Sequence, residues 1–152
     1  MIPTKISQRV VLDRLDWVQR MISEIEALPL SDHDQFMADS RNVWTAESCL
    51  RRGLEALLDV GRHILAKGFG KGVTEYKEIA RQLGEKGVLS QENARLLRIL
   101  AGYRNRMVHF YHEISTEELY EISATHLSDL KIIAEAYRSW LKKHPEMLDT
   151  VL

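Results

Sequence analysis

The sequence predicts an all-α protein, folded as an up-and-down bundle of about five helices. Apolar residues recur three to five positions apart through nearly the whole chain, which is the spacing of one face of an α-helix. Glycines, prolines and hydroxyl side chains gather between these segments, where helices end and begin. No segment carries a β-hairpin signal or an internal repeat. These observations together indicate the all-α class.

Length and composition favour one domain that covers residues 1–152. Of the 152 residues, 45% are hydrophobic and 28% are charged, which is typical of a globular domain with its own core. The formal net charge is -1, so a site for a polyanion must be local rather than spread over a basic surface. Cys49 is the single cysteine and cannot form an internal disulfide. With no apolar run of membrane-spanning length and no signal-peptide core, we expect a cytoplasmic protein without a membrane partner.

Two long helices are expected in the N-terminal half. The first covers residues 4–28 and stops before Pro29, which cannot continue a helix. The second covers residues 31–67, an unusual length, and a break inside it would fall at residues 39–42. The glycines of KGFGKG, residues 67–72, end this helix and begin a connection.

Three further helices are expected after this connection. A short one fits residues 74–83, and a longer one covers residues 91–111 after the capping residue Ser90. The last covers residues 115–144 and starts with the Ser-x-x-Glu spacing of a capping box at Ser115.

The expected helix 91–111 ends in the stretch RNRMVHFY, residues 104–111. Successive side chains on a helix are rotated by about 100°, so each has a predictable direction around the axis. With Leu96 set at zero, one group of apolar side chains falls within about 40° and should face the core: Leu100, Tyr103, Met107, Phe110 and Ile114. The polar side chains lie outside this stripe, with Arg104 and Tyr111 on one shoulder at about 60° to 80°. The opposite face carries Asn105, His109 and His112.

A second apolar strip lies beside Arg104 and predicts a homodimer. Its members are Leu97, Ala101 and Val108, and they lie where a monomer would be expected to show polar residues, so we expect another surface to cover them. Arg104 and His109 are about 140° apart on an ideal helix, too far for one helix to aim both at a single phosphate. Two copies paired through this strip could bring both residues of each chain into one shared cleft.

These residue types point to chemistry on a phosphodiester. Asn105 and His109 form an i, i+4 pair, so the amide can hold one imidazole nitrogen and leave the other to move a proton. Arg104 supplies a planar set of donors that suits a phosphate and the charge developing on it during transfer. Arg104 and His109 are therefore the candidate catalytic residues, with Asn105 in support.

Two of the neighbouring polar residues have both a functional and a structural interpretation. Arg106 could add positive charge to an RNA groove or lie solvated on the helix face. His112 could act as a second imidazole or as an exposed bystander near the helix end. No carboxylate or thiol cluster of ligand spacing accompanies the histidines, so we expect neither a metal site nor another cofactor.

The stretch RNRMVHFY resembles the Arg-x4-His-x-Tyr motif of HepT toxins, which are minimal members of the HEPN ribonuclease superfamily. The match includes Arg104, Asn105, His109 and Tyr111. Residues 76–114 are also similar to the family's short helix, glycine turn and leucine-rich helix that lead into the motif.

The resemblance implies a HEPN-like fold and the toxin role in a type VII toxin–antitoxin system. Its members are homodimeric, metal-independent endoribonucleases, which implies that Arg104 and His109 act on an RNA substrate, either tRNA or mRNA. It also implies a partner, an MntA-like nucleotidyltransferase antitoxin, which adds AMP to the motif tyrosine. Here that residue would be Tyr111.

A second reading from another functional class stays open. The chain could be a catalytically idle helical module, either an accessory subunit of a nucleotidyltransferase or a dimerisation partner. The two readings separate on substitution, because a binding module has no need of the proton-transfer group at His109.

Overall fold

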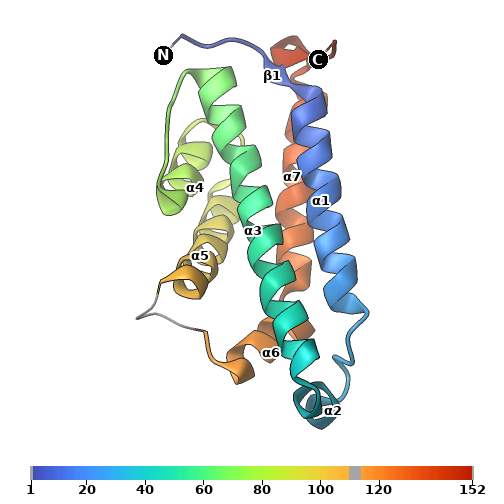
Figure 1. Cartoon of the computed structure of the whole chain (residues 1–152). Helices are drawn as coiled ribbons and strands as arrows, with labels where there is room; N and C mark the ends of the chain where they lie inside the picture. The colour runs from blue at the N-terminus through green and yellow to red at the C-terminus, as the bar shows by residue number, and fades with distance from the viewer. Residues whose placement is uncertain (1, 110–113, 152) are drawn as a thin grey trace.

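In the computed structural model, which describes residues 2–109 and 114–151, the chain is an α-helical bundle (Figure 1). The predicted all-α class is confirmed. The α-helices of the described residues are α1 (Gln8–Glu26), α2 (His33–Ala38), α3 (Ser40–Phe69), α4 (Tyr76–Glu85), α5 (Gln91–Val108), α6 (Thr116–Thr125) and α7 (Leu127–Lys143).

The long helix α3 runs through the middle of the bundle (Figure 1). Helices α1 and α7 lie along one side of it, α4 and α5 lie along the other, and α6 and α2 lie at the lower end. The core is a continuous cluster of buried aliphatic side chains from these helices, with Phe36 and Tyr137 as its largest fully buried aromatic residues. No helix among the described residues is long and apolar enough to cross a membrane.

The two ends of the described chain meet in a short parallel pairing that the sequence pattern did not predict. Strand β1 (Ile6–Ser7) pairs with β2 (Leu148–Asp149), which follows the 3₁₀ turn η2 (Pro145–Met147). Ile6 is part of this pairing and is fully buried. The pairing therefore joins the segment before α1 to the segment after α7.

The predicted break near residue 39 is confirmed and has a clear cause. Asp39 has extended backbone angles, and its side chain accepts a hydrogen bond from the Arg41 backbone N–H at 2.9 Å, so it caps α3 and separates it from α2. At the other end, Gly70 adopts the left-handed conformation (φ 65°) that commonly terminates a helix. The predicted glycine stop is therefore also confirmed.

The single helix expected over residues 115–144 is two helices, α6 and α7. The predicted cap at Ser115 is present, with its hydroxyl accepting from the Glu118 backbone N–H at 3.1 Å. Near the end of α6, the Thr125 hydroxyl donates to the Glu121 carbonyl at 2.7 Å, a local bond that bends helices. The backbone then leaves the helical conformation at His126, and α7 starts at the next residue.

The expected helix 91–111 ends at Val108, which changes the geometry of the motif. His109 is the C-terminal cap with extended backbone angles (φ -94°, ψ 122°), although its N–H still donates to the Asn105 carbonyl at 3.0 Å. Directions calculated for an ideal helix therefore apply only as far as His109. Phe110, Tyr111 and His112 lie outside the described residues.

The buried face of α5 also differs from the expected one. Leu100 of the expected stripe is fully buried, and so are Leu97 and Ala101, whereas Leu96, Tyr103 and Met107 are only partly buried against the core. The reason is α4, whose Gly84 and Tyr76 lie against Ala94 and Arg104, on the helix face that also carries Leu97 and Ala101. The expectation that a second copy must cover this strip was wrong for these two residues; only Val108 of the strip is exposed.

Gly61 of α3 allows the close approach of α4 and α7. A β-carbon placed there would lie 2.7 Å from Leu83 Cδ1 and 2.8 Å from the Tyr137 hydroxyl oxygen, both closer than van der Waals contact. We expect Gly61→Ala to lower the free energy of unfolding by about 1–3 kcal/mol through overpacking. Urea denaturation would measure this loss.

Gly53, in the same helix, provides the matched control. Its added β-carbon would lie 3.4 Å from Met21 Cβ and farther from every other neighbour. Alanine stabilises the interior of a helix by roughly 0.5–1 kcal/mol relative to glycine. Gly53→Ala should therefore raise the free energy of unfolding by part of this amount. Equal effects of the two substitutions would contradict the assigned contact.

Candidate functional site

Arg104 lies on α5 with its side chain directed against α4 rather than into solvent. Its guanidinium carbon is 4.7 Å from the centre of the Tyr76 ring, within the range of a cation–π interaction. Arg104 Nη2 is 3.8 Å from a carboxylate oxygen of Glu55 on α3, and its side chain is 24% exposed. Within the described residues, the buried Arg104 Nε has no hydrogen-bond partner. Two neighbours therefore orient the guanidinium while part of its donor set is uncommitted.

A second arginine, Arg62 of α3, lies over the same tyrosine. Its guanidinium carbon is 5.1 Å from the Tyr76 ring centre. Its Nη1 donates to Asp59 at 3.0 Å, and its Nη2 donates to the Thr74 carbonyl at 3.0 Å. Arg62 therefore ties α3 to the segment before α4 and brings a second positive charge to the Arg104 side of the bundle.

Asp59 and Tyr76 share a partly buried hydrogen bond. The Tyr76 hydroxyl donates to Asp59 Oδ1 at 3.4 Å. Burial raises the pKa of the Asp59 carboxyl, and the nearby charges of Arg62 and Arg14 oppose this rise. Burial also raises the pKa of the Tyr76 hydroxyl, so the tyrosine stays a neutral donor and platform for the two arginines.

Arg104, Asn105 and His109 line one pocket of about 340 Å³, together with residues from α3, α4 and the segment before α4. We call it the motif pocket. The other lining residues are Arg62, Thr74, Glu75 and Tyr76. Arg104 and His109 of one chain therefore line the same pocket, and the need for a second copy to bring both to one phosphate stays a prediction.

Other predicted site residues have different surroundings. The backbone carbonyl of Asn105 accepts a hydrogen bond from the backbone N–H of His109. The expected contact between their side chains stays a prediction. Tyr111 and His112 lie outside the described residues. Their predicted roles also stay predictions.

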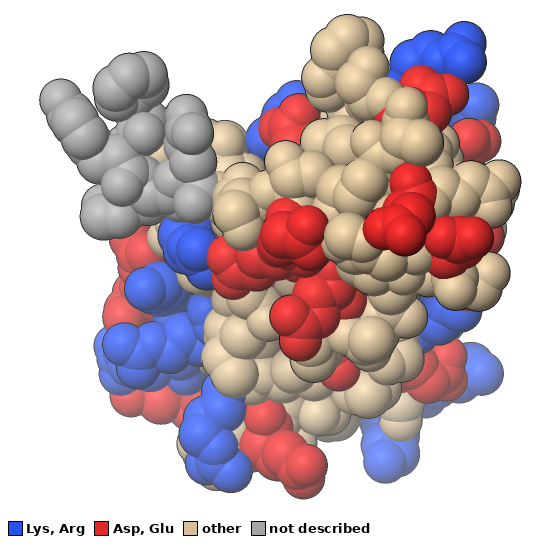
Figure 2. All heavy atoms as spheres, turned by 90° about the horizontal axis from the view of Figure 1, so that it is seen from below, with Lys and Arg blue, Asp and Glu red and all other residues tan. Residues whose placement is uncertain are grey.

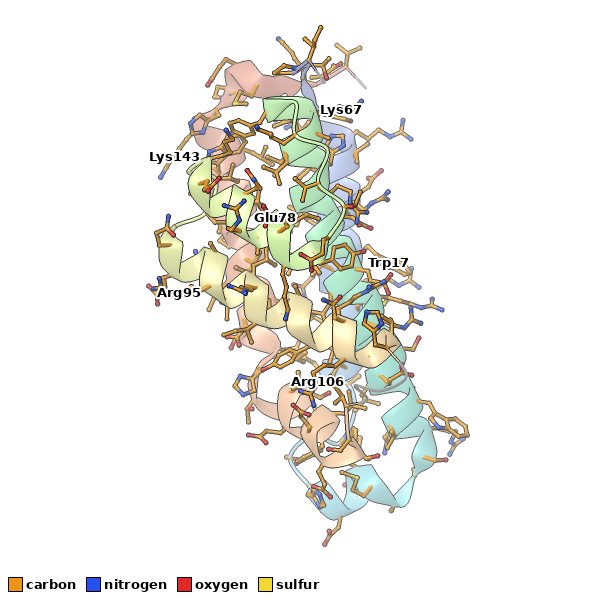
Figure 3. The ribbon with its side chains drawn as sticks, turned by 90° about the vertical axis from the view of Figure 1, so that its left-hand side faces the viewer. Trp17, Lys67, Glu78, Arg95, Arg106 and Lys143 are labelled. Carbon is orange, nitrogen blue, oxygen red and sulfur yellow. The ribbon has the colours of Figure 1, made fainter. Side chains whose placement is uncertain are left out.

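Arg106 is engaged by the helix that follows the motif (Figure 3). Its two terminal nitrogens donate to the two carboxylate oxygens of Glu118 at 2.6 and 2.7 Å, in a bidentate pair between α5 and α6. The bond lowers the pKa of the Glu118 carboxyl. This pair gives Arg106 a structural role, and a further contact with RNA stays a prediction.

Sequence reasoning did not single out Tyr76 or Arg62. Neither residue belongs to a motif with Arg104, and no local spacing connects them, because the contacts join α3, α4 and α5. The available signal was an aromatic residue at the start of a short amphipathic helix, which equally indicates packing. Within residues 2–109 and 114–151, no group of three or more histidine, cysteine or acidic side chains could hold a metal ion.

Comparison with known proteins gives a consistent family assignment. The family model "Ribonuclease HepT-like" matches residues 18–137. The chain is 24% identical over 139 residues to the tRNA nuclease HepT of Aphanizomenon flos-aquae, covering 91% of this chain and 94% of that protein. It is 30% identical over 128 residues to a protein of Archaeoglobus fulgidus named as a predicted RNase, covering 84% and 89% of the two chains.

A solved structure shows the same fold. The tri-AMPylated HEPN toxin of Shewanella oneidensis, in complex with its MNT antitoxin, superimposes with a TM-score of 0.77 at 21% identity. The likeness covers 86% of this chain and 97% of that toxin. A fold match of this extent agrees with the family model, which spans most of the bundle. The chain therefore belongs to the HepT-like ribonuclease family.

Proposed function

We propose that this protein is the toxin of a toxin–antitoxin pair and acts as a metal-independent endoribonuclease. The observation that carries the proposal is the single pocket lined by Arg104, Asn105 and His109, the three described residues of the motif. The family assignment supports the same activity, since its members include a protein named as a tRNA nuclease. We take tRNA as the first RNA to test, with mRNA as the alternative.

The proposed reaction is transfer of the phosphodiester to the neighbouring ribose oxygen. The 2′-hydroxyl oxygen attacks the adjacent phosphorus and forms a new O–P bond, while an imidazole of His109 accepts its proton. The bond from phosphorus to the 5′-oxygen breaks, and that oxygen takes a proton from an imidazolium. Arg104 stabilises the negative charge on the phosphate oxygens as it develops. The products are a 2′,3′-cyclic phosphate and a 5′-hydroxyl.

We further propose that the active form is a homodimer with the motifs of both copies at one cleft. His109 and Val108 are both exposed beside the pocket, so the site is open on that side in one chain. A second copy covering this side would exclude water and place a second Arg104 and His109 near the bound phosphate.

The proposed regulator is an MntA-like nucleotidyltransferase antitoxin that transfers AMP to Tyr111. The fold likeness to a toxin that is tri-AMPylated and bound to its antitoxin supports this partner. We place the pair in the cytoplasm, where both RNA and ATP are available.

Replacement of one ribose tests the RNase proposal. We expect the purified protein to cleave RNA in the presence of EDTA. A 2′-deoxy substitution at the cleaved nucleotide should abolish that cut, because DNA lacks the attacking hydroxyl. Denaturing gels and mass spectrometry of the product ends would measure both results. Cleavage of the deoxy substrate, or activity that EDTA removes, would contradict the mechanism. No cleavage of any RNA would favour the idle accessory subunit.

A further inference from the structure

A second pocket, of about 330 Å³, lies between α1 and α3 and is not part of the motif. Its lining combines an aromatic ring with positive and negative side chains: Arg14, Trp17, Arg51, Arg52, Glu55, Ala56 and Asp59. Trp17 is 37% exposed, which is a large exposure for so large an apolar ring. We call this the α1–α3 pocket.

The α1–α3 pocket adjoins the candidate site across two carboxylates of α3. Glu55 pairs with Arg51 at 3.0 Å in the α1–α3 pocket and lies 3.8 Å from Arg104 in the motif pocket. Asp59 lines the α1–α3 pocket and accepts hydrogen bonds from Arg62 and Tyr76, which line the motif pocket. One turn of α3 therefore lies between the two pockets, and its carboxylates are paired with Arg51 and Arg62, so their charge is compensated.

The positive charge of the α1–α3 pocket is only partly neutralised. Among residues 2–109 and 114–151, neither Arg14 nor Arg52 forms an ion pair, whereas Arg51 is paired with Glu55. A further arginine, Arg20, lies with its guanidinium carbon 5.6 Å from the Trp17 ring centre. An aromatic face surrounded by unpaired arginines is the usual platform for single-stranded nucleic acid.

The rest of the surface limits the direction in which RNA could leave the motif pocket. Acidic side chains gather at the lower end of the molecule (Figure 2). Three of them, Glu117, Glu118 and Glu121, line a groove on α6. RNA is repelled from that end, whereas Trp17 lies on the side of the bundle toward which the C-terminal end of α5 points (Figure 3).

We infer that the α1–α3 pocket binds the single-stranded RNA that flanks the cleaved phosphodiester. One base stacks on Trp17, and the phosphates beside it contact Arg14 and Arg52. The inference rests on the proposed RNase function and adds a second recognition site to it. A second copy of the chain is a poorer occupant, because a two-fold contact here would bring two sets of arginines together.

Substrate length provides the test. The rate constant kcat/KM is measured for a dinucleotide, which reaches only the motif pocket, and for an octanucleotide of the same central sequence. We expect Trp17→Ala to lower the octanucleotide value about tenfold, the loss typical of one stacked base, with the dinucleotide value nearly unchanged. Arg14→Gln and Arg52→Gln should each reduce the slope of log binding constant against log salt concentration for the octanucleotide by about one.

Trp44 is the matched control, since it is 66% exposed and lies outside both pockets. Trp44→Ala should leave both substrates unaffected. If Trp17→Ala lowers kcat/KM equally for the two substrates, the inference is overturned and the surface serves folding. If Trp17→Ala dissociates the dimer in ultracentrifugation, the inference is also overturned and the surface contacts a second copy. If wild type cleaves RNA and none of the three variants changes the length dependence, this inference fails alone. If wild type cleaves no RNA, the proposed function fails with it.

Discussion

Replacing Arg104 with alanine is expected to lower the rate of RNA cleavage by about 10²- to 10³-fold, the usual cost of removing one donor that stabilises transition-state charge. The structure gives the reason, because Tyr76 and Glu55 hold the guanidinium in the motif pocket while its Nε has no partner within the described residues. Arg104→Lys should also be strongly impaired, since an ammonium keeps the charge but not the planar set of donors. Initial rates on a labelled RNA would measure both losses.

In the same assay, His109→Ala should lower the rate of RNA cleavage by about 10²- to 10⁴-fold, the range for removal of a general acid or base. Arg95→Ala is the control, because Arg95 is an exposed arginine at the other end of the same helix (Figure 3). Urea denaturation separates loss of chemistry from loss of folding. Activity of either motif variant close to that of Arg95→Ala, with an intact fold, would remove these residues from the mechanism.

Mixing the two inactive variants tests whether the dimer shares its cleft. If Arg104 of one copy acts with His109 of the other, subunit exchange between Arg104→Ala and His109→Ala dimers restores one site in each mixed dimer. About a quarter of the wild-type activity should then return at a 1:1 ratio, since half of the dimers are mixed. No recovery, with exchange verified, would mean that each chain uses its own pocket, and would contradict the shared cleft without affecting the RNase proposal.

The helices could be predicted from the sequence because their signals are local. The break at Asp39 and the caps at Ser90 and Ser115 depend on residues within one turn, and all are present in the structure. The end of α5 was misplaced because the apolar spacing through Phe110 continues beyond the point where the helix stops at Val108.

The site could be predicted only in part, for a different physical reason. Periodicity gives the relative directions of side chains on α5, but it does not say which side a neighbouring helix covers. Helix α4 covers Leu97 and Ala101, so the true buried face is shifted toward Arg104, which becomes half-buried against Tyr76. The motif identified Arg104 and His109, whereas Arg62, Glu55 and Tyr76 join the site through contacts between helices that no single-helix pattern contains.

Transfer of AMP to Tyr111 is expected to reduce cleavage to below about 1% of the unmodified rate, because the added phosphate occupies the anion site and pairs with its arginine. In the transfer, the tyrosine oxygen attacks the α-phosphorus of ATP and loses its proton. An O–P bond forms there, and the bond to the departing pyrophosphate breaks. The product carries one negative charge for each AMP.

Tyr111→Phe separates this regulation from catalysis, because phenylalanine keeps the ring and lacks the oxygen that accepts AMP. After co-expression with an MntA-like nucleotidyltransferase, intact-mass measurement should show AMP-sized increments on wild type and on the control Tyr103→Phe, and none on Tyr111→Phe. The unmodified Tyr111→Phe protein should keep cleaving RNA, and its toxicity should resist the antitoxin. Increments that persist on Tyr111→Phe would place the modification on another residue. An unmodified but silenced wild type would instead mean that the antitoxin acts by binding, covering the pocket rather than filling it with phosphate.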